Sequence, residues 1–408
     1  MTHTKPTAIP VMPTHGLIAL LAALAAIGAL STNIILPAFP AIAVSLGVAT
    51  SQLGLTLSIF FMVFAVSQLL VGPLSDRFGR RRLVIGGLLI FAAGCVVCAL
   101  ATDLSMLMLG RAVQAAGVCA ASVLARAIAR DLFEGESLAR VLSMVIVAMA
   151  AAPGFSPLLG GLAEQWIGWR LSFMAVGGLG VALAIWYALR LHETHPAARR
   201  MPLAIGPVLS SYLALLRDAR FVRPASAVAC VIGALYGFFT AAPAILMGPF
   251  GLTTLALGAF FAATVPVVFA AGIAVPRLAR RWGAQRVARI GVLLALIGGA
   301  LIWAIGMSAH ANLTTFVAAL CIFLLGMGMV NPLGTALALG PFPAQAGAAS
   351  AMLGFMQMVG AALGATLVTK LDSGSTIATL GVVIVGAQVV ALVVLSLPSP
   401  AQRAVSAT

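Results

Sequence analysis

Long runs of apolar residues alternate with short polar segments along almost the whole chain. Runs of about 18 or more apolar residues with few charges are typical of membrane-spanning helices. The first half contains six such runs, at roughly 17–38, 52–73, 83–101, 105–127, 140–162 and 168–190. The second half contains six more, at roughly 222–246, 255–276, 287–307, 312–338, 346–369 and 376–397. The pattern therefore predicts an all-α integral membrane protein with twelve transmembrane helices.

One sizeable polar stretch separates the two groups of apolar runs. It extends from Leu191 to Phe221 and contains "HETHPAARRMP", which is rich in proline and arginine. We therefore expect a six-helix bundle over 1–190, a cytoplasmic linker over 191–221 and a second six-helix bundle over 222–408. The first apolar run is long and has no obvious cleavage site, so we expect a retained helix and not a signal peptide.

The composition of the chain agrees with a membrane protein. Hydrophobic residues make up 62% of the 408 residues and charged residues only 8%, and the mean hydropathy is +1.14. A soluble domain needs many more charged side chains to cover its surface. The composition therefore excludes a water-soluble fold.

The net charge of +14 would favour nucleic-acid binding in a soluble protein, but the basic residues lie almost entirely in alternate loops. Only Arg170 and Lys370 fall on the opposite side, and Arg111 lies within a span. Short loops rich in Lys and Arg stay in the cytoplasm, so both termini and the linker are expected there. Anionic lipids are the expected partners of these loops, and we expect no nucleic-acid partner because no aromatic residues are interleaved with the basic ones.

A short internal repeat relates the two halves of the chain. The segment "PLSDRFGRRR" around Gly79 has a counterpart, "PRLARRWGAQR", around Gly283, and the two glycines are 204 residues apart. Each copy follows the second apolar run of its half. The repeat therefore predicts two bundles with the same orientation.

The first copy of this repeat also contains an acid that topology does not require. Gly79 suits a tight turn and the arginines hold the loop inside, whereas Asp76 needs another reason. Its carboxylate can pair with Arg77 and Arg80 or bind the N-terminus of a helix, which attracts anions. The alternative is a solvated cluster of charges that contributes little.

Polar side chains within the apolar runs are candidates for a substrate cavity. An arginine inside a span, such as Arg111, costs at least about 2.5 kcal/mol unless it is paired or hydrated, so we expect it to face a cavity and not to reach the outer interface. A mostly apolar pocket with a few polar groups suits small amphipathic molecules. Packing against helices or lipid is the alternative for each aromatic candidate. The candidate substrate-binding residues are Asn33, Arg111, Gln114, Tyr236, Phe239, Asn331 and Gln357.

Three motifs in the sequence resemble those of a known family. The loop with Gly72, Asp76, Arg77, Gly79 and Arg80 resembles the signature loop of the major facilitator superfamily. The segment "LGRAVQAAGV", with Arg111 and Gln114, resembles the intramembrane arginine motif of that superfamily. The segment "APGFSPLLGG" resembles its exporter motif, here represented by Pro153, Gly154, Pro157, Gly160 and Gly161. Together with "GWRLSF", "LHET" and "ASAMLGFMQ", nearly the whole chain resembles the Bcr/CflA exporters of bicyclomycin and chloramphenicol.

The resemblance implies a major facilitator fold and a monomer in the bacterial inner membrane. It implies efflux of small amphipathic drugs or toxic metabolites by alternating access, coupled to protons, with the signature loop latching the halves in one transport state. Asn33 departs from the pattern, because related exporters often carry a carboxylate there. None of the 9 acids lies near the middle of a predicted span, so the proton-coupling group is not visible. Export or uptake of a specific metabolite, with no or different ion coupling, is the alternative.

The sequence shows no set of residues that would support an enzymatic reaction. A membrane-embedded enzyme would require a convergent nucleophile, base or metal set. Cys95 and Cys98 form a C-x-x-C pattern, but they have no nearby His or carboxylate in the sequence and suit a role as small apolar fillers. We therefore expect no enzyme activity, no cofactor and no metal.

Overall fold

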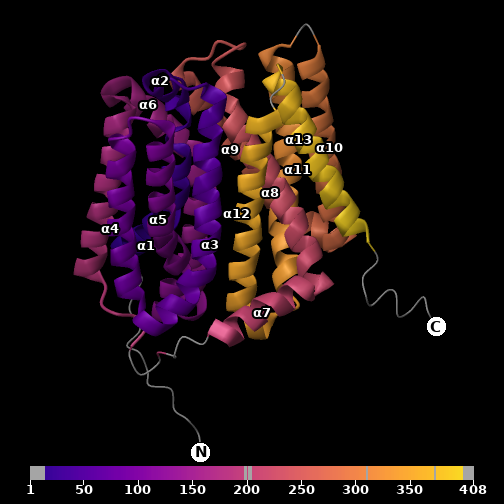
Figure 1. Cartoon of the computed structure of the whole chain (residues 1–408). Coiled ribbons are helices and arrows are strands. Elements are labelled where there is room, and N and C mark those ends of the chain that lie inside the picture. Colours follow the sequence, from indigo (N-terminus) through magenta and orange to yellow (C-terminus); the bar gives the residue numbers. More distant parts are fainter. Residues whose placement is uncertain (1–13, 197–199, 201–204, 309–310, 372–373, 398–408) are drawn as a thin grey trace, which may run out of the picture.

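A computed structural model describes residues 14–196, 200, 205–308, 311–371 and 374–397, and they fold into helices without strands. Figure 1 shows α1 to α6 gathered on one side of the molecule and α8 to α13 on the other. The helices are, in chain order, α1 (His15–Asn33), η1 (Leu36–Ala38), α2 (Phe39–Leu46), η2 (Thr50–Leu53), α3 (Gly54–Phe78), α4 (Arg80–Ala99), α5 (Leu104–Leu132), α6 (Gly135–Arg190), α7 (Ile205–Arg217), α8 (Ala219–Leu246), α9 (Thr254–Trp282), α10 (Ala284–Met307), α11 (Leu313–Leu339), η4 (Pro343–Gln345), α12 (Ala346–Leu371) and α13 (Thr376–Ser396).

The number of membrane-crossing segments agrees with the sequence. Among the described residues, 11 helical segments are long and apolar enough to cross a membrane. One of them, α6, has 56 residues, and a helix of that length would extend about 84 Å, far beyond the roughly 30 Å hydrocarbon core. Gly168 interrupts it with the non-helical angles φ 75° and ψ 167°. Counting α6 as two spans gives the predicted twelve and confirms the predicted fold class.

The first span differs from the prediction of one continuous helix over 17–38. Helix α1 ends at Asn33, and the chain continues as the short helices η1 and α2. Pro37 and Pro40 lack the N–H groups that would bond the carbonyls of Asn33 and Leu36 in a continuous helix. The helix therefore breaks where the apolar pattern continues.

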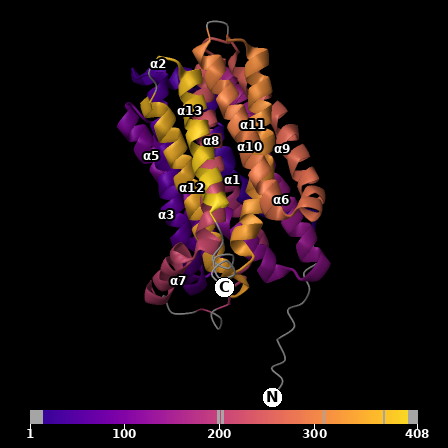
Figure 2. The same cartoon turned by 90° about the vertical axis from the view of Figure 1, so that its right-hand side faces the viewer.

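Several helices extend beyond the predicted spans at one end of the bundle. We call this end the linker end, because α7 lies across it, and the opposite end the far end; Figures 1 and 2 both show α7 there. Helices α3, α5 and α9 continue to Phe78, Leu132 and Trp282, and basic residues occupy their last turns. Apolarity marks only the part of a helix inside the hydrocarbon region, whereas helical hydrogen bonding continues past it.

The repeated loop forms the same tight turn in both halves. Gly79 joins α3 to α4 with φ 91°, and Gly283 joins α9 to α10 with φ 82°. Both angles lie in a region that residues with a Cβ atom rarely adopt. The structure therefore confirms the turn that the sequence predicts at Gly79 and shows the same turn at Gly283 in the second copy of the repeat.

The segment 191–221, predicted as a linker, contains the helix α7. This helix buries Tyr212 and Leu215, whereas Leu209, Leu213 and Leu216 on its other side are exposed. It contacts α8 and α12 and crosses beneath them (Figure 1). An amphipathic helix in this position fits a membrane surface, which the polar character of the segment did not indicate.

The two halves meet along two pairs of helices. Helix α3 packs against α12, and the first span of α6 packs against α9. Each pair joins a helix of the first half to a helix of the second. The space between the halves is therefore bounded by these contacts.

Candidate transport pathway

A cavity of about 210 Å³ lies between the halves. We call it the central cavity; α1, α3, α5 and α6 line it from the first half, and α8 and α12 from the second. Its wall is largely apolar and includes Phe60, Phe61 and Phe64. No acid occurs among its lining residues in the described chain. The polar residues in its wall are Thr32, Gln68, Ser122, Arg126, Tyr236 and Gln357.

The structure brings only part of the predicted substrate-binding set to this cavity. Tyr236 and Gln357 line it. Phe239 packs in an aromatic cluster instead, with ring centroids 5.4 Å from Tyr236 and 5.0 Å from Phe261. Asn331 is half-buried on α11 and is not among the lining residues. In this conformation the remaining three candidates, Asn33, Arg111 and Gln114, lie outside the cavity wall.

Arg111 is fully buried inside the first half and does not face the central cavity as expected. Its Nη1 donates to the carbonyl oxygen of Ser31 and to Oε1 of Gln114, both at 2.9 Å. Ser31 lies in the last turn of α1, where carbonyl groups lack helical partners. The guanidinium also lies 4.5 Å from the ring centroid of Phe60. Carbonyl oxygens and the face of an aromatic ring therefore stabilise the positive charge of Arg111, which does not face the cavity.

The partners of Arg111 form part of a buried polar network. Nε2 of Gln114 donates to Sγ of Cys95 at 2.9 Å. The ion pairs between side chains of the described chain involve other arginines. Nε and Nη2 of Arg111 have no hydrogen-bond partner in the described chain. The cation is thus buried without an acid beside it.

Asn33 lies just behind the wall of the central cavity. Its Nδ2 donates to the carbonyl oxygen of Ala29 at 2.8 Å. Its side chain lies beside the hydroxyl of Tyr236, but Oδ1 has no hydrogen-bond partner within the described part of the chain. Asn33 can therefore act on the cavity through Tyr236.

The proline and glycine motif in α6 lies where the two halves are closest. A Cβ atom on Gly161 would lie 2.8 Å from the carbonyl oxygen of Thr254 in the second half, whereas one on Gly160 would lie 2.8 Å from the carbonyl carbon of Ile34 within the first half. On the facing helix, a Cβ on Gly258 would lie 2.7 Å from the carbonyl oxygen of Pro157. Small residues thus allow backbones to meet and close the far end.

The other two residues of this motif lie deeper in the bundle. Pro153 lines the central cavity. Gly154 lies against Val265 and the carbonyl oxygen of Phe261 on α9. The motif therefore extends from the cavity wall to the far-end contact.

A second cavity, of about 300 Å³, occupies the linker end. Gly72, Asp76 and Arg80 line it on one side, and Gly347 and Ser350 of α12 line it on the other. We call it the linker-end cavity. The signature loop is therefore separated from α12 by this cavity in the present conformation.

The charges of the signature loop are paired within the first half. Nη1 of Arg80 lies 2.8 Å from Oδ1 of Asp76, and Nε of Arg80 lies 3.3 Å from Oδ2 of Asp131. Arg77 instead lies over the ring of Phe78, 5.4 Å from its centroid. Asp76 remains 49% exposed, so its pair with Arg80 is partly screened by water.

Glu193 caps the N-terminus of α4, a role that the sequence analysis considered for Asp76. Its carboxylate accepts hydrogen bonds from the backbone N–H groups of Arg80, at 2.8 Å, and Arg81, at 3.3 Å. Nη2 of Arg200 lies 3.7 Å from the same carboxylate. An acid at a helix N-terminus is favourable because it satisfies N–H groups and the helix dipole. The available signal was an acid within "LHET", directly after α6.

Tyr212 joins α7 to the first half. Its hydroxyl donates to the carbonyl oxygen of Leu69 on α3 at 3.0 Å. In a regular helix that carbonyl would accept from residue 73, but Pro73 has no N–H group. Burial raises the pKa of Tyr212, which keeps the phenol protonated and able to donate. The linker helix therefore contacts both halves.

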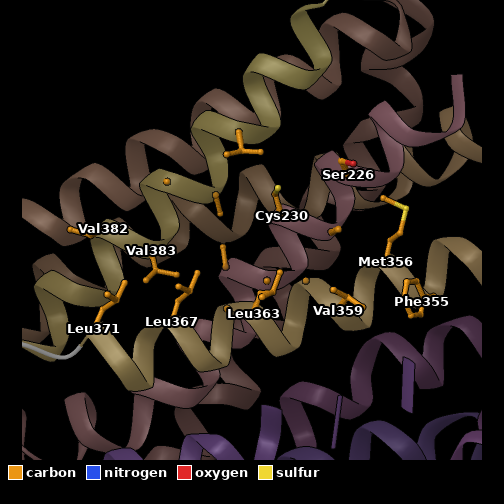
Figure 3. A pocket seen from close by; sticks show the side chains of 18 residues that line it. Ser226, Cys230, Phe355, Met356, Val359, Leu363, Leu367, Leu371, Val382 and Val383 are labelled. Carbon is orange, nitrogen blue, oxygen red and sulfur yellow. The ribbon is translucent and has the colours of Figure 1, made fainter. Parts of the chain in front are cut away.

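A third cavity, of about 600 Å³, is a groove on the second half and lies apart from these sites. Figure 3 shows that α8, α12 and α13 surround it and that apolar side chains such as Val359, Leu363 and Leu367 line it. Leu363 and Leu367 are also exposed on the outer surface. In a membrane this groove faces lipid, so we assign it to lipid chains and not to the transport pathway.

Comparisons with known proteins agree with this architecture. The family model described as Major Facilitator Superfamily matches residues 21–365. Multidrug resistance protein D of Escherichia coli (strain K12) is 30% identical over 86% of this chain and 88% of its own. A chloramphenicol resistance protein of Pseudomonas aeruginosa is 29% identical over 76% of this chain and 73% of its own.

A solved structure extends the agreement to the fold. A bacterial homolog of the human lysosomal transporter Spinster, in an inward-facing and unoccupied conformation, superposes with a TM-score of 0.73. It covers 93% of this chain and 95% of its own, at 17% sequence identity. The family match, the relatives and the helical architecture agree with the predicted resemblance, and the chain belongs to the major facilitator superfamily of membrane transporters.

Proposed function

We propose that this transporter exports small amphipathic compounds, including drugs, by alternating access of the central cavity to the two membrane faces. The observation that carries the proposal is the cavity itself, which both halves line and which combines aromatic walls with a few polar groups. The far end is closed by backbone contacts, whereas the linker end contains a further cavity. This arrangement suits one state of an alternating-access cycle.

Similarity to proteins named for multidrug and chloramphenicol resistance supports drugs as substrates. Expression in a bacterial host without its own exporters tests the proposal. Accumulation of chloramphenicol and a panel of cationic, neutral and anionic amphiphiles should fall relative to cells with an empty vector. Unchanged accumulation and tolerance for every compound would contradict export.

Within this proposal, Tyr236 and Gln357 contact the substrate directly, and Asn33 acts through Tyr236. Among the described residues, the wall of the central cavity contains the cation Arg126 and no acid, so neutral and anionic compounds should be preferred over lipophilic cations. Arg111 supports the cavity from inside the first half, because its hydrogen bond to the Ser31 carbonyl ties α5 to α1. Efflux of matched charged and neutral compounds measures this preference.

The orientation in the bacterial inner membrane is a further part of the proposal. The basic loops place the linker end, both termini and the 191–221 segment in the cytoplasm. Single cysteines at Ala198 and Ser406, which lie outside the described residues, should resist an impermeant thiol reagent in intact cells without other cysteines. Ready labelling of either position would contradict this orientation.

Proton coupling is the least constrained part of the proposal, since no described acid lines the central cavity. Export of one specific metabolite without proton coupling is therefore the second candidate function. Proteoliposomes with an imposed pH gradient distinguish the two. Chloramphenicol accumulation that follows the gradient supports proton antiport, gradient-independent movement of chloramphenicol contradicts proton coupling, and absence of chloramphenicol movement favours the second candidate.

A further inference from the structure

Arg126 on α5 lies where the two internal cavities meet. It lines both the central cavity and the linker-end cavity, and only Gln68 and Val123 share this position among the described lining residues. These three side chains therefore lie at the junction of the two cavities. An arginine that served topology alone would instead extend toward lipid headgroups.

The charge of Arg126 has no acid to balance it within the described chain. The two acids that line the linker-end cavity, Asp76 and Asp131, both pair with Arg80. Asp131 also accepts a hydrogen bond from Oγ1 of Thr194 at 3.2 Å. The next basic residue on α5, Arg130, lines only the linker-end cavity and adds a like charge. A half-buried cation in this setting attracts an anion.

Two buried polar side chains, each with an atom that has no described hydrogen-bond partner, lie at the same junction of the cavities. Ser122 is 5% exposed, lines the central cavity and lies one helical turn from Arg126 on the same face of α5. Its Oγ has no hydrogen-bond partner in the described structure. Gln68 is 7% exposed, and its Oε1 is also without a described partner. Unsatisfied buried polar atoms are uncommon, and a bound ligand can supply the missing partner.

We propose that Arg126, together with the Ser122 hydroxyl, binds the anionic group of transported compounds at the junction of the two cavities. The substrate class is a small organic anion, with a carboxylate or sulfonate attached to an apolar body. The guanidinium can donate two parallel hydrogen bonds to such a group. The apolar body then lies against Phe60, Phe61 and Phe64 in the central cavity. This inference rests on the proposed export function and specifies its substrate.

Binding to the purified full chain in lipid nanodiscs tests the inference. The probes are naphthylacetate, its neutral amide naphthylacetamide and the cation naphthylethylammonium, measured by equilibrium dialysis. We expect the wild type to prefer the anion, and Arg126→Gln to weaken its binding by about 10- to 100-fold, the effect of losing a charged hydrogen bond. Arg126→Lys should retain most of the preference, because it keeps the charge.

Arg130→Gln is the matched control, since it removes a neighbouring charge from the linker-end cavity alone. It should change anion binding by less than about threefold, because general attraction between exposed charges is weak. Binding of naphthylacetamide checks that each variant retains a folded cavity.

The outcomes separate this inference from the proposed function. No anion preference in the wild type, an unchanged preference in Arg126→Gln, or an equal loss in Arg130→Gln would overturn the role of Arg126. Efflux of neutral chloramphenicol from cells would then still support export. Absence of all efflux from cells would instead overturn the proposed function, whatever the binding measurements show.

Discussion

Substitution of Gly161 by alanine should open the far end of the transporter. The new Cβ atom would lie 2.8 Å from the carbonyl oxygen of Thr254 and 3.3 Å from its carbonyl carbon, which are backbone atoms of the second half that cannot rotate away. Overpacking of this kind costs about 1–3 kcal/mol. Since 1.4 kcal/mol is a factor of ten, the state with a closed far end should lose about 5- to 150-fold in population relative to the alternative.

Distances across the far end measure this shift. Spin labels at Val44 on α2 and Ser308 after α10, both exposed, report on the separation of the halves by pulsed dipolar EPR. The five native cysteines, which form no disulfide, would first be replaced. Gly161→Ala should lengthen the main distance between the labels and slow transport, because the closed state becomes rare.

Gly178 provides a matched control on the same helix. It also lies in α6, but a Cβ atom there would have no neighbour within 4 Å. Gly178→Ala should leave both the distance and the transport rate as in the wild type. If Gly161→Ala behaves in the same way as Gly178→Ala, the far-end contact does not control the transport states.

The remaining predictions concern the linker end and the polar groups. Tyr212→Phe removes the hydrogen bond to the Leu69 carbonyl, which is worth about 1 kcal/mol. The reactivity of a cysteine introduced at Ser350 in the linker-end cavity should therefore change about fivefold. Identical reactivity would contradict the idea that the contact of α7 with α3 controls access to this cavity. Asp76→Asn should preserve insertion but reduce transport, because the charge that pairs with Arg80 is lost; full transport at normal protein levels would favour a solvated charge cluster. Asn33→Asp should introduce a new pH dependence and weaken anion efflux, since it places a titratable acid beside Tyr236; a flat pH profile refutes this. Arg111→Ala should abolish efflux, because it removes the hydrogen bond from α5 to the Ser31 carbonyl of α1 and the contact with the Phe60 ring of α3, and wild-type rates in this variant would exclude that role.

The helices and turns were readable from the sequence because membrane burial and tight turns impose local rules. Apolar runs predicted the spans of the described chain, and Gly79 predicted a tight turn, which Gly283 repeats in the second half. The break after Asn33 was missed because proline and apolar signals conflicted there, although Pro37 and Pro40 were visible. Helix α7 was missed because the mixed sequence of the linker hides a single apolar face.

The site was less predictable than the fold because a side chain's surroundings depend on packing between distant helices. Arg111 was expected to face a cavity, but its contacts with Ser31 and Phe60 bury it inside the first half. Arg126 looked like one of many basic residues near the cytoplasmic face, and its position between two cavities appears only in the structure. Glu193 similarly meets the start of α4 across 113 residues of sequence.

Access to the central cavity from both membrane faces tests the account most directly. Gln357 lines this cavity, and a Gln357→Cys variant without other cysteines can be reconstituted in oriented proteoliposomes. An impermeant thiol reagent should label it from either face during turnover, and chloramphenicol, if transported, should slow labelling from both. Labelling from one face alone, or from neither, would contradict alternating access through this cavity.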